Sequence, residues 1–326
     1  MSVRFAIVGC GNAARQIHLP ALRAAGVEVT TFASRSRSSA ESLRDDWGRG
    51  TVAERWEDAV ARADVDAVVI AVPNALHRDV AIAAASSGKH VLVDKPMACT
   101  VEHADEMIKA ADANGVVLVP FHNTRFAAPF VAAHGLVASG RVGQITGLRA
   151  SFGHGGPQTW APQAKWFFDP KQSGGGCLID LGVHVIDLIR YVTGENITDV
   201  AAVLTRRKSD VETDAQLLVS MDGGAIGTIH ASWSSRSGPD HQLTVIGTDG
   251  TLHLDNRTPL TFIDTDGARE RVELPDATSS PLAELLAAIA GAREPSITAE
   301  DGRAAVSVVQ AAYMSADRNA VMIRVD

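Results

Sequence analysis

A short apolar segment followed by a glycine pattern stands near the start of the chain and constrains its fold more than any other feature. Residues 5–8 have the composition of a strand, and Gly9, Gly11 and Ala14 follow as G-x-G-x-x-A. Gly9 permits a tight turn, Gly11 lets the backbone approach a pyrophosphate, and Ala14 lets the next helix pack closely on the strand. The N-terminus of that helix faces the phosphates. Strand, turn and helix together predict a dinucleotide-binding unit.

Strands and helices alternate through the first part of the chain. Further apolar strands are expected at 27–33, 67–71, 90–93 and 116–119, and helices at 13–25, 39–47, 78–87 and 101–113. Continuous apolar strands separated by helices indicate a parallel sheet that is covered on both faces. Residues 1–121 are therefore predicted to form a Rossmann-type, doubly wound α/β domain.

The pattern changes after residue 121. Strands are expected at 146–152, 197–205, 215–221, 225–234, 242–247 and 251–255, with hairpin turns at 222–224 and 248–250 and two helices near 282–290 and 304–316. Neighbouring strands joined by short turns are typical of antiparallel pairing. Residues 122–326 are therefore predicted to form an α+β domain with a large, mostly antiparallel open sheet, which binds the substrate and mediates oligomerisation.

Composition excludes several classes of partner. Hydrophobic residues make up 46% of the chain and charged residues 21%, which is ordinary for a globular protein. The formal net charge of -8 argues against a nucleic acid or an anionic membrane as partner. Basic residues are scattered, and the only short clusters are Arg-Ser-Arg at 35–37 and Arg-Arg-Lys at 206–208.

The cysteines and the apolar runs indicate in which cellular compartment the protein works. The three cysteines show neither a metal-binding spacing nor a disulfide framework, which fits a reducing environment. No apolar run approaches the length needed to span a bilayer, and no signal peptide precedes the first strand. We expect a cytoplasmic protein with no metal site.

The end of the second strand indicates which cofactor is used. An acidic residue there accepts the ribose hydroxyl of NAD, but this chain has Ser34 and Arg35 instead. A hydroxyl and a guanidinium suit a 2′-phosphate, so NADP(H) is favoured. The alternative is that Arg35 and Arg37 belong to a solvated loop and that NAD is used. The candidate cofactor-binding residues so far are Gly9, Gly11, Asn12, Ala13, Ser34 and Arg35.

The loop after the third apolar strand adds three candidates. A loop at the carboxyl edge of a strand faces the cofactor in such folds. Pro73 fixes the turn and Asn74 offers amide hydrogen bonds. His77 either contacts the cofactor or caps the following helix.

Two further motifs, combined with the N-terminal glycine pattern, resemble the Gfo/Idh/MocA family of nicotinamide-dependent oxidoreductases. The first is Asp94-Lys95-Pro96 after the strand at 90–93, and the second is the glycine-rich run at 173–187 that contains Asp180 and His184. Asn-Thr-Arg-Phe at 123–126 and the glycines at 140 and 143 agree with this resemblance. The family pattern at the first motif is Glu-Lys-Pro, so Asp94 is a departure, whereas Lys95 keeps the family's catalytic position.

The resemblance implies that Lys95, Asp180 and His184 surround the substrate, with Asp94 and Asn123 beside the cofactor. The residue types support this independently. Asp180 and His184 are four apart and share one face of a helix, and the three glycines before them would let that helix start against a ligand. A desolvated lysine can polarise or deprotonate a hydroxyl, and a histidine suits proton transfer near neutral pH.

Two residues in the second half are further substrate-binding candidates with open alternatives. Arg125 either clamps a polar or anionic substrate or forms a structural ion pair. Trp166 either stacks on a sugar or on the cofactor, or belongs to the core.

The sequence thus predicts an NADP(H)- or NAD(H)-dependent dehydrogenase that acts on a carbinol of a sugar, cyclitol or related polyhydroxy compound. Two alternatives remain. One is a sugar lyase or glycosidase that uses transient redox of a tightly bound nicotinamide. The other is a non-catalytic dinucleotide-binding sugar sensor, against which the retained Lys95, Asp180 and His184 argue.

An assembly is also expected. The antiparallel sheet should pack its inner face on the helix at 180–193, while its outer face keeps apolar and aromatic residues. That expectation rests on the alternation of Ile229, Ala231 and Trp233 with Thr228, His230 and Ser232. An apolar patch on a sheet normally polar on its solvated side suggests a partner, and the resemblance implies dimers or tetramers through this sheet. The alternative is a monomer whose sheet faces water.

Overall fold

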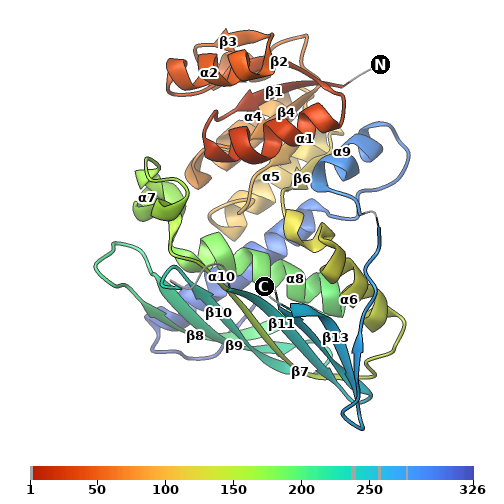
Figure 1. Ribbon diagram of the computed structural model, residues 1–326. Helices are drawn as coiled ribbons and strands as arrows, with labels where there is room; N and C mark the ends of the chain where they lie inside the picture. The colour runs from red at the N-terminus through yellow and green to blue at the C-terminus, as the bar shows by residue number, and fades with distance from the viewer. Residues whose placement is uncertain (1–2, 236–239, 256–257, 277) are drawn as a thin grey trace. The chain divides into compact units, whose positions relative to one another are not determined.

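The computed structural model describes residues 3–235, 240–255, 258–276 and 278–326 (Figure 1). The chain forms two compact units. The first comprises Met1–His122 together with Ser279–Arg303, and the second comprises Asn123–Thr278 together with Ala304–Asp326. The first unit is thus built from two separate stretches of sequence.

The first unit contains a six-stranded sheet in which every pair of neighbours is parallel. The strand order β3-β2-β1-β4-β5-β6 is that of a doubly wound dinucleotide-binding fold, so the predicted Rossmann sheet is confirmed. Its strands are β1 (Arg4–Val8), β2 (Glu28–Ala33), β3 (Thr51–Ala53), β4 (Ala67–Ile70), β5 (His90–Val93) and β6 (Leu118–Pro120).

The helices of this unit begin and end at residues that suit their positions. They are η1 (Ala14–His18, π-wound), α1 (Leu19–Ala24), α2 (Arg37–Trp47), α3 (Trp56–Val60), α4 (His77–Ser86) and α5 (Val101–Asn114), with a 3₁₀ turn η2 (Asn74–Leu76). The Thr100 hydroxyl accepts from the backbone of His103 at the start of α5, and Gly115, at φ 61°, ends that helix. Strand β3 and helix α3 were not predicted.

One helix predicted in the second half of the chain belongs to the first unit. Helix α9 (Pro281–Ile289) packs against β5 and β6. Its Glu284 is 1% exposed, and its carboxylate binds the Arg293 side chain and accepts from the backbone nitrogen of Ser296 at 2.8 Å. This buried carboxylate therefore ties residues 293–296, which follow α9, to that helix.

The second unit is built on a nine-stranded sheet with the order β14-β13-β12-β11-β7-β10-β9-β8-β15. The pair β7–β10 is parallel and the other pairs are antiparallel, so the predicted open, mostly antiparallel sheet is confirmed. The strands are β7 (Ile145–Gly153), β8 (Ile197–Thr205), β9 (Asp214–Met221), β10 (Ile226–Ser232), β11 (Asp240–Gly247), β12 (Gly250–Asp255), β13 (Thr258–Asp264), β14 (Arg269–Arg271) and β15 (Ile323–Arg324).

Helices cover one face of this sheet. In Figure 1, α6 and α8 run along the same side of the strands, and α8 packs on β7 while α6 reaches β13. The helices and turns of this unit are η3 (Asn123–Phe126), α6 (Ala128–Ala138), η4 (Pro157–Thr159), η5 (Lys165–Phe168), α7 (Pro170–Ser173), η6 (Leu178–Gly182), α8 (Val183–Thr193) and most of α10 (Ala299–Asp317). The core lies between α8 and the covered face.

The opposite face of the sheet presents apolar side chains, but not the ones named from the sequence. Ile229, Ala231 and Trp233 are buried and point toward the core, so no aromatic residue of that set lies outside. The exposed apolar residues are Val203, Leu218 and Ile226 instead, which are 61%, 46% and 62% exposed. We call these three residues the outer-face patch.

Candidate active site

The glycine turn at the end of β1 fits a dinucleotide. Gly9 has φ +99° and donates its N–H to Ala33 at 2.8 Å, and a Cβ there would lie 2.2 Å from the carbonyl oxygen of Ala71. The turn therefore holds the ends of β1, β2 and β4 close together. Gly11 is exposed, and no heavy atom lies within 4 Å of the position that its Cβ would take. This open backbone is what close approach of a pyrophosphate requires.

The helix after the turn carries the next two candidates. Asn12 is exposed, Ala13 is half-buried, and Ala14 is fully buried against the sheet. The chain then winds as a π-helix through η1, whereas the sequence predicted a plain α-helix over 13–25. π-Turns are frequent at functional sites.

The end of β2 has no acidic side chain, and the two candidate cofactor-binding residues there are accessible to solvent. Ser34 is half-buried and Arg35 is exposed. Among the described residues, Arg35 forms no ion pair, whereas Arg37 is bound by Glu41 at 2.9 Å and Glu54 at 3.3 Å. Ser36 caps α2 by accepting from the backbone of Ser39. Arg35 is therefore the guanidinium of this loop that is not held by a carboxylate.

His77 links two loops at the carboxyl edge of the sheet. Its ring is fully buried, with Nδ1 2.8 Å from the carbonyl oxygen of Pro96 and Nε2 2.9 Å from that of Val72. Burial lowers the pKa of this imidazole. The capping alternative is wrong, because α4 begins without a side-chain cap. Pro73 is half-buried and Asn74 buried in the same loop.

Asp94 organises the backbone that carries Lys95. Its Oδ1 accepts the backbone N–H of Lys95 at 2.8 Å, and its Oδ2 lies 3.4 Å from Nε2 of the buried His18. Burial opposes ionisation of this carboxyl, but the contact with His18 and the charges of His18, Lys95 and His77 outweigh it, so the pKa of Asp94 is lowered. The carboxylate and the half-buried Lys95 thus form one structured unit after β5.

Asp180 and His184 lie in the buried helical stretch of the second unit. Asp180 is 5% exposed within the π-wound η6, and His184 is 8% exposed in the first turn of α8. The Trp233 indole N–H donates to Oδ2 of Asp180 at 2.9 Å, and Nε2 of His154 lies 3.9 Å from the same oxygen. The Asp180 carboxylate is therefore oriented by an indole from the end of β10 and faced by a second imidazole.

His184 is held by a hydroxyl and an aromatic ring. Its Nδ1 lies 3.2 Å from the hydroxyl oxygen of Thr124, and the Phe152 ring meets the imidazole edge-on with centroids 5.7 Å apart. Thr124 follows Asn123, which is exposed at the start of η3. The turn that the sequence placed at the domain junction therefore positions the imidazole of α8.

The structure gives Arg125 and Trp166 the structural roles that the sequence had left open, an ion pair and a place against the core. The Arg125 guanidinium forms an ion pair with Asp187 in which both side chains are at most 4% exposed. Trp166 is half-buried, stacks on Phe167 with centroids 3.9 Å apart, and packs against the core.

The glycines before Asp180 accommodate a buried carboxylate, which corrects the expectation that they let the helix start against a ligand. Glu212 Oε1 accepts from the backbone nitrogens of Gly176 at 2.8 Å and Leu178 at 3.0 Å, and from the Tyr313 hydroxyl at 2.9 Å. A Cβ at Gly176 would lie 1.9 Å from the Glu212 carbonyl oxygen, and one at Gly175 would lie 1.9 Å from the Tyr313 hydroxyl.

Sequence reasoning missed four residues that hold these side chains: Thr124, His154, Glu212 and Trp233. Each acts across a long stretch of sequence, as Trp233 does on Asp180 over 53 positions. Of the four, Thr124 lies in the Asn-Thr-Arg-Phe motif at 123–126 and His154 lies beside two glycines, whereas Glu212 and Trp233 carried no local signal of a site.

The described residues form neither a metal-binding cluster nor a membrane-spanning helix. No group of three or more His, Cys, Asp or Glu side chains there is arranged to hold a metal ion. No helix there combines the length and the apolar character needed to cross a membrane.

Comparison with known families defines the class of this protein. The model described as the oxidoreductase family with an NAD-binding Rossmann fold matches residues 3–122. The model described as the GFO/IDH/MocA C-terminal domain matches residues 130–253. Because the two matches cover most of the chain, this protein belongs to the Gfo/Idh/MocA family and is an oxidoreductase.

Characterised relatives agree with this family. The chain is 31% identical over 310 residues to 1,5-anhydro-D-fructose reductase from Ensifer adhaerens, and the match covers 92% of each protein. It is 26% identical over 244 residues to scyllo-inositol 2-dehydrogenase (NADP(+)) from Bacillus subtilis, covering 74% of this chain and 66% of that one. The structure of GenD2 from gentamicin A biosynthesis in complex with NAD is similar with a TM-score of 0.86 at 28% identity, covering 100% of this chain and 97% of that one.

The Glu212 contact generates a stability prediction. Gly176→Ala should destabilise the protein by about 1–3 kcal/mol, because the added methyl group meets backbone that cannot rotate away. Gly135→Ala is the control, since it lies inside α6 with no atom within 4 Å of its Cβ position. That substitution should be neutral or stabilise by up to about 1 kcal/mol. Denaturant unfolding measures both, and equal effects would contradict the crowding at residue 176.

Proposed function

We propose that this protein transfers a hydride between a nicotinamide cofactor, preferentially NADP(H), and a hydroxyl-bearing carbon of a sugar, cyclitol or related polyol. The observation that carries the proposal is the buried Asp180 and His184 arrangement, in which an acid and an imidazole are each held by a dedicated partner. The names of the relatives, a reductase of an anhydro-sugar and a dehydrogenase of an inositol, support this substrate class.

In this proposal the first unit, with Asn123 of the second, holds the cofactor. Gly9, Gly11, Asn12 and Ala13 would bind the pyrophosphate, and Ser34 and Arg35 the adenosine side. Pro73, Asn74, Asp94 and Asn123 would line the remainder, while His77 keeps the loops after β4 and β5 in place. When bound, the nicotinamide supplies the hydride acceptor or donor.

His184 is assigned the proton transfer. We assign the proton of the neutral ring to Nδ1, which would donate to the Thr124 hydroxyl oxygen 3.2 Å away, and the lone pair then lies on Nε2. Nε2 would accept the hydroxyl proton of the substrate during oxidation and return it during reduction. An imidazole titrates near neutral pH and therefore suits both directions.

Asp180 and Lys95 orient and polarise the reacting group in this proposal. Asp180, whose carboxylate is fixed by Trp233, would hold a neighbouring substrate hydroxyl or the base. Lys95 would donate to the reacting oxygen and polarise it. Arg125 would act by positioning, since its ion pair with Asp187 ties η3 to α8. Trp166, which packs against the core and stacks on Phe167, would not contact the substrate.

The loop after β2 generates a cofactor prediction. NADP(H) should bind more tightly than NAD(H), and Arg35→Ala should weaken NADP(H) by about 1–3 kcal/mol while leaving NAD(H) nearly unchanged. Arg55→Ala, which removes an exposed arginine paired with Glu57, is the control and should change neither. Calorimetry with both cofactors measures this, and tighter binding of NAD(H) by the unmodified protein would refute the preference.

The catalytic assignment is tested by substitution. Lys95→Met and His184→Ala should keep cofactor binding nearly intact and reduce turnover by about 10²–10⁴-fold, as loss of a positioned proton-transfer group does. Lys109→Met, on the exposed side of α5, and His103→Ala should turn over normally. Near-normal turnover in both site variants would rule out the assignment.

The substrate is identified by a panel of sugars, inositols and keto-sugars followed through the absorbance of the reduced nicotinamide with both cofactors. A purified protein that retains a dinucleotide and turns over without added oxidant would instead be a lyase or glycosidase with transient redox. Cofactor binding without turnover on any compound would point to a sensor.

We further propose that the protein is a homo-oligomer that buries the outer-face patch. Val203, Leu218 and Ile226 share one face of neighbouring strands, since Leu218 pairs with Ala201 and with Thr228. Aliphatic side chains exposed together on an open sheet are typical of an interface.

Charged substitutions test the assembly. Leu218→Lys combined with Ile226→Glu should convert the oligomer to a 34.3 kDa monomer, because burying charged side chains in an interface has a high free-energy cost. Leu76→Glu, an exposed apolar residue of the first unit, is the control and should leave the mass unchanged. Light scattering at micromolar concentration decides: a 34.3 kDa species for the unmodified chain would exclude the oligomer.

A further inference from the structure

The surface of the second unit has an open hollow with two compartments. The larger has a volume of about 1040 Å³ and the smaller about 390 Å³, and both are lined by Gln158, Phe168 and Arg207. All lining residues belong to the second unit. Cavities for drug-sized ligands measure about 300–1,000 Å³, and a single sugar ring is smaller than such a ligand. The hollow therefore has room for more than the reacting sugar.

The larger compartment adjoins Asp180. His154 and Trp233 both line it, and Oδ2 of Asp180 lies 3.9 Å from His154 Nε2 and accepts from the Trp233 indole N–H at 2.9 Å. Trp160 is 40% exposed and also lines this compartment, with its ring resting edge-on against Phe167. An exposed aromatic face suits the apolar face of a sugar ring.

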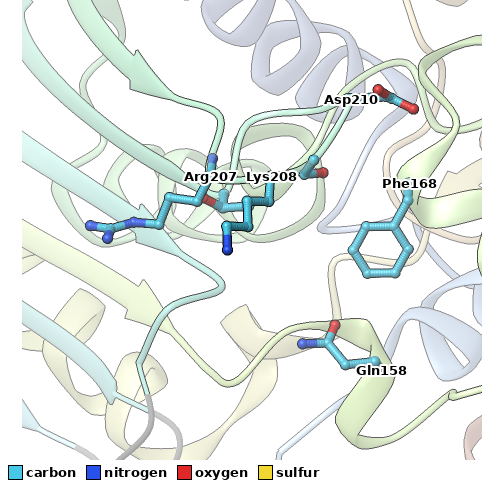
Figure 2. Close-up of a pocket in the computed structure, with 7 residues that line it drawn as sticks. Gln158, Phe168, Arg207, Lys208 and Asp210 are labelled. Atoms are coloured by element: carbon cyan, nitrogen blue, oxygen red, sulfur yellow. The ribbon is translucent and has the colours of Figure 1, made fainter.

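The smaller compartment carries the basic cluster that the proposed reaction does not use. Figure 2 shows the Lys208 side chain turned into the space that the Gln158 amide faces, with the Phe168 ring on one side. The Asp210 carboxylate lies away from the Lys208 amine in this view. An amine, an amide and an aromatic ring thus converge on the space beyond the larger compartment.

The lysine of this compartment favours an anion. Arg207, Lys208 and Asp210 line the compartment, and the Asp210 carboxylate lies away from the Lys208 amine (Figure 2). Arg207 is paired with Asp214 at 3.0 Å, and Asp214 also accepts from Ser232 and Ser234. Lys208 forms no ion pair within the part of the chain that the structure describes. The Lys208 ammonium is therefore the cation of this compartment that has no carboxylate partner among the described residues.

We propose that the substrate has two parts, a polyol ring beside Asp180 and an anionic group, carboxylate or phosphate, bound by Lys208 and Gln158 over Phe168. The proposal rests on the proposed function for the placement of the ring, and it adds the chemistry of the second part. Gln158 Nε2 donates one N–H to the carbonyl oxygen of Gly155 at 2.7 Å, so its second N–H is the donor that the anion would take. Hydrogen bonds from a lysine and an amide are contacts that such an anion takes in proteins.

Binding measurements test this without turnover. Calorimetry with glucose, glucuronate and glucose 6-phosphate compares one neutral probe with two anionic probes of similar ring, and the two anions separate carboxylate from phosphate recognition. At least one anion should bind about 10-fold or more tightly than glucose, the effect expected of a hydrogen bond to a charged group. Added salt should reduce this difference.

Two variants locate the effect. Lys208→Gln should abolish most of the preference for the anion, whereas Arg206→Gln should keep it within about twofold, because Arg206 is exposed in the same loop but does not line the compartment. Circular dichroism verifies that both variants fold. Equal binding of all three probes, no measurable binding of either anion, or equal loss in the two variants would overturn the proposal. The proposed function fails separately, through absence of nicotinamide turnover.

Discussion

The carboxylate of Glu212 is the contact on which the second unit depends. One oxygen accepts from the backbone of Gly176 and Leu178 and from the Tyr313 hydroxyl, so it joins the segment before β9, the start of η6 and helix α10. Burial raises the pKa of Glu212 despite these donors. A buried charge is tolerated only when such partners replace water. Because Asp180 lies one turn beyond Gly176, its place follows from this contact.

Local patterns explain why much of the fold could be predicted. The turn at Gly9 and the apolar strands need only near neighbours, and together with the handedness of parallel crossovers they determine the strand order of the first unit. Asp94-Lys95-Pro96 was located for the same reason, because it directly follows an apolar strand. The spacing of Asp180 and His184 was also visible, although the π-winding through Asp180 was not.

Contacts between distant segments could not be predicted from one sequence. Nothing near Trp233 indicates that its indole binds Asp180, and the alternation of its strand was even interpreted as leaving aromatic side chains on the outer face. The glycines at 175 and 176 indicated close approach, but not that Glu212 and Tyr313 approach them. The parallel pairing of β7 with β10 is of the same kind, because strand composition does not specify a partner.

The discontinuity of the first unit has a consequence for synthesis. Strands β5 and β6 emerge from the ribosome early, yet α9, which packs on them, is made only after β7 to β14 of the second unit. Nascent domains begin to fold from the N-terminus as they emerge. The first unit therefore lacks α9 on β5 and β6 until residues 123–278 of the second unit have been translated, and only residues 304–326, which complete the second unit, are made later.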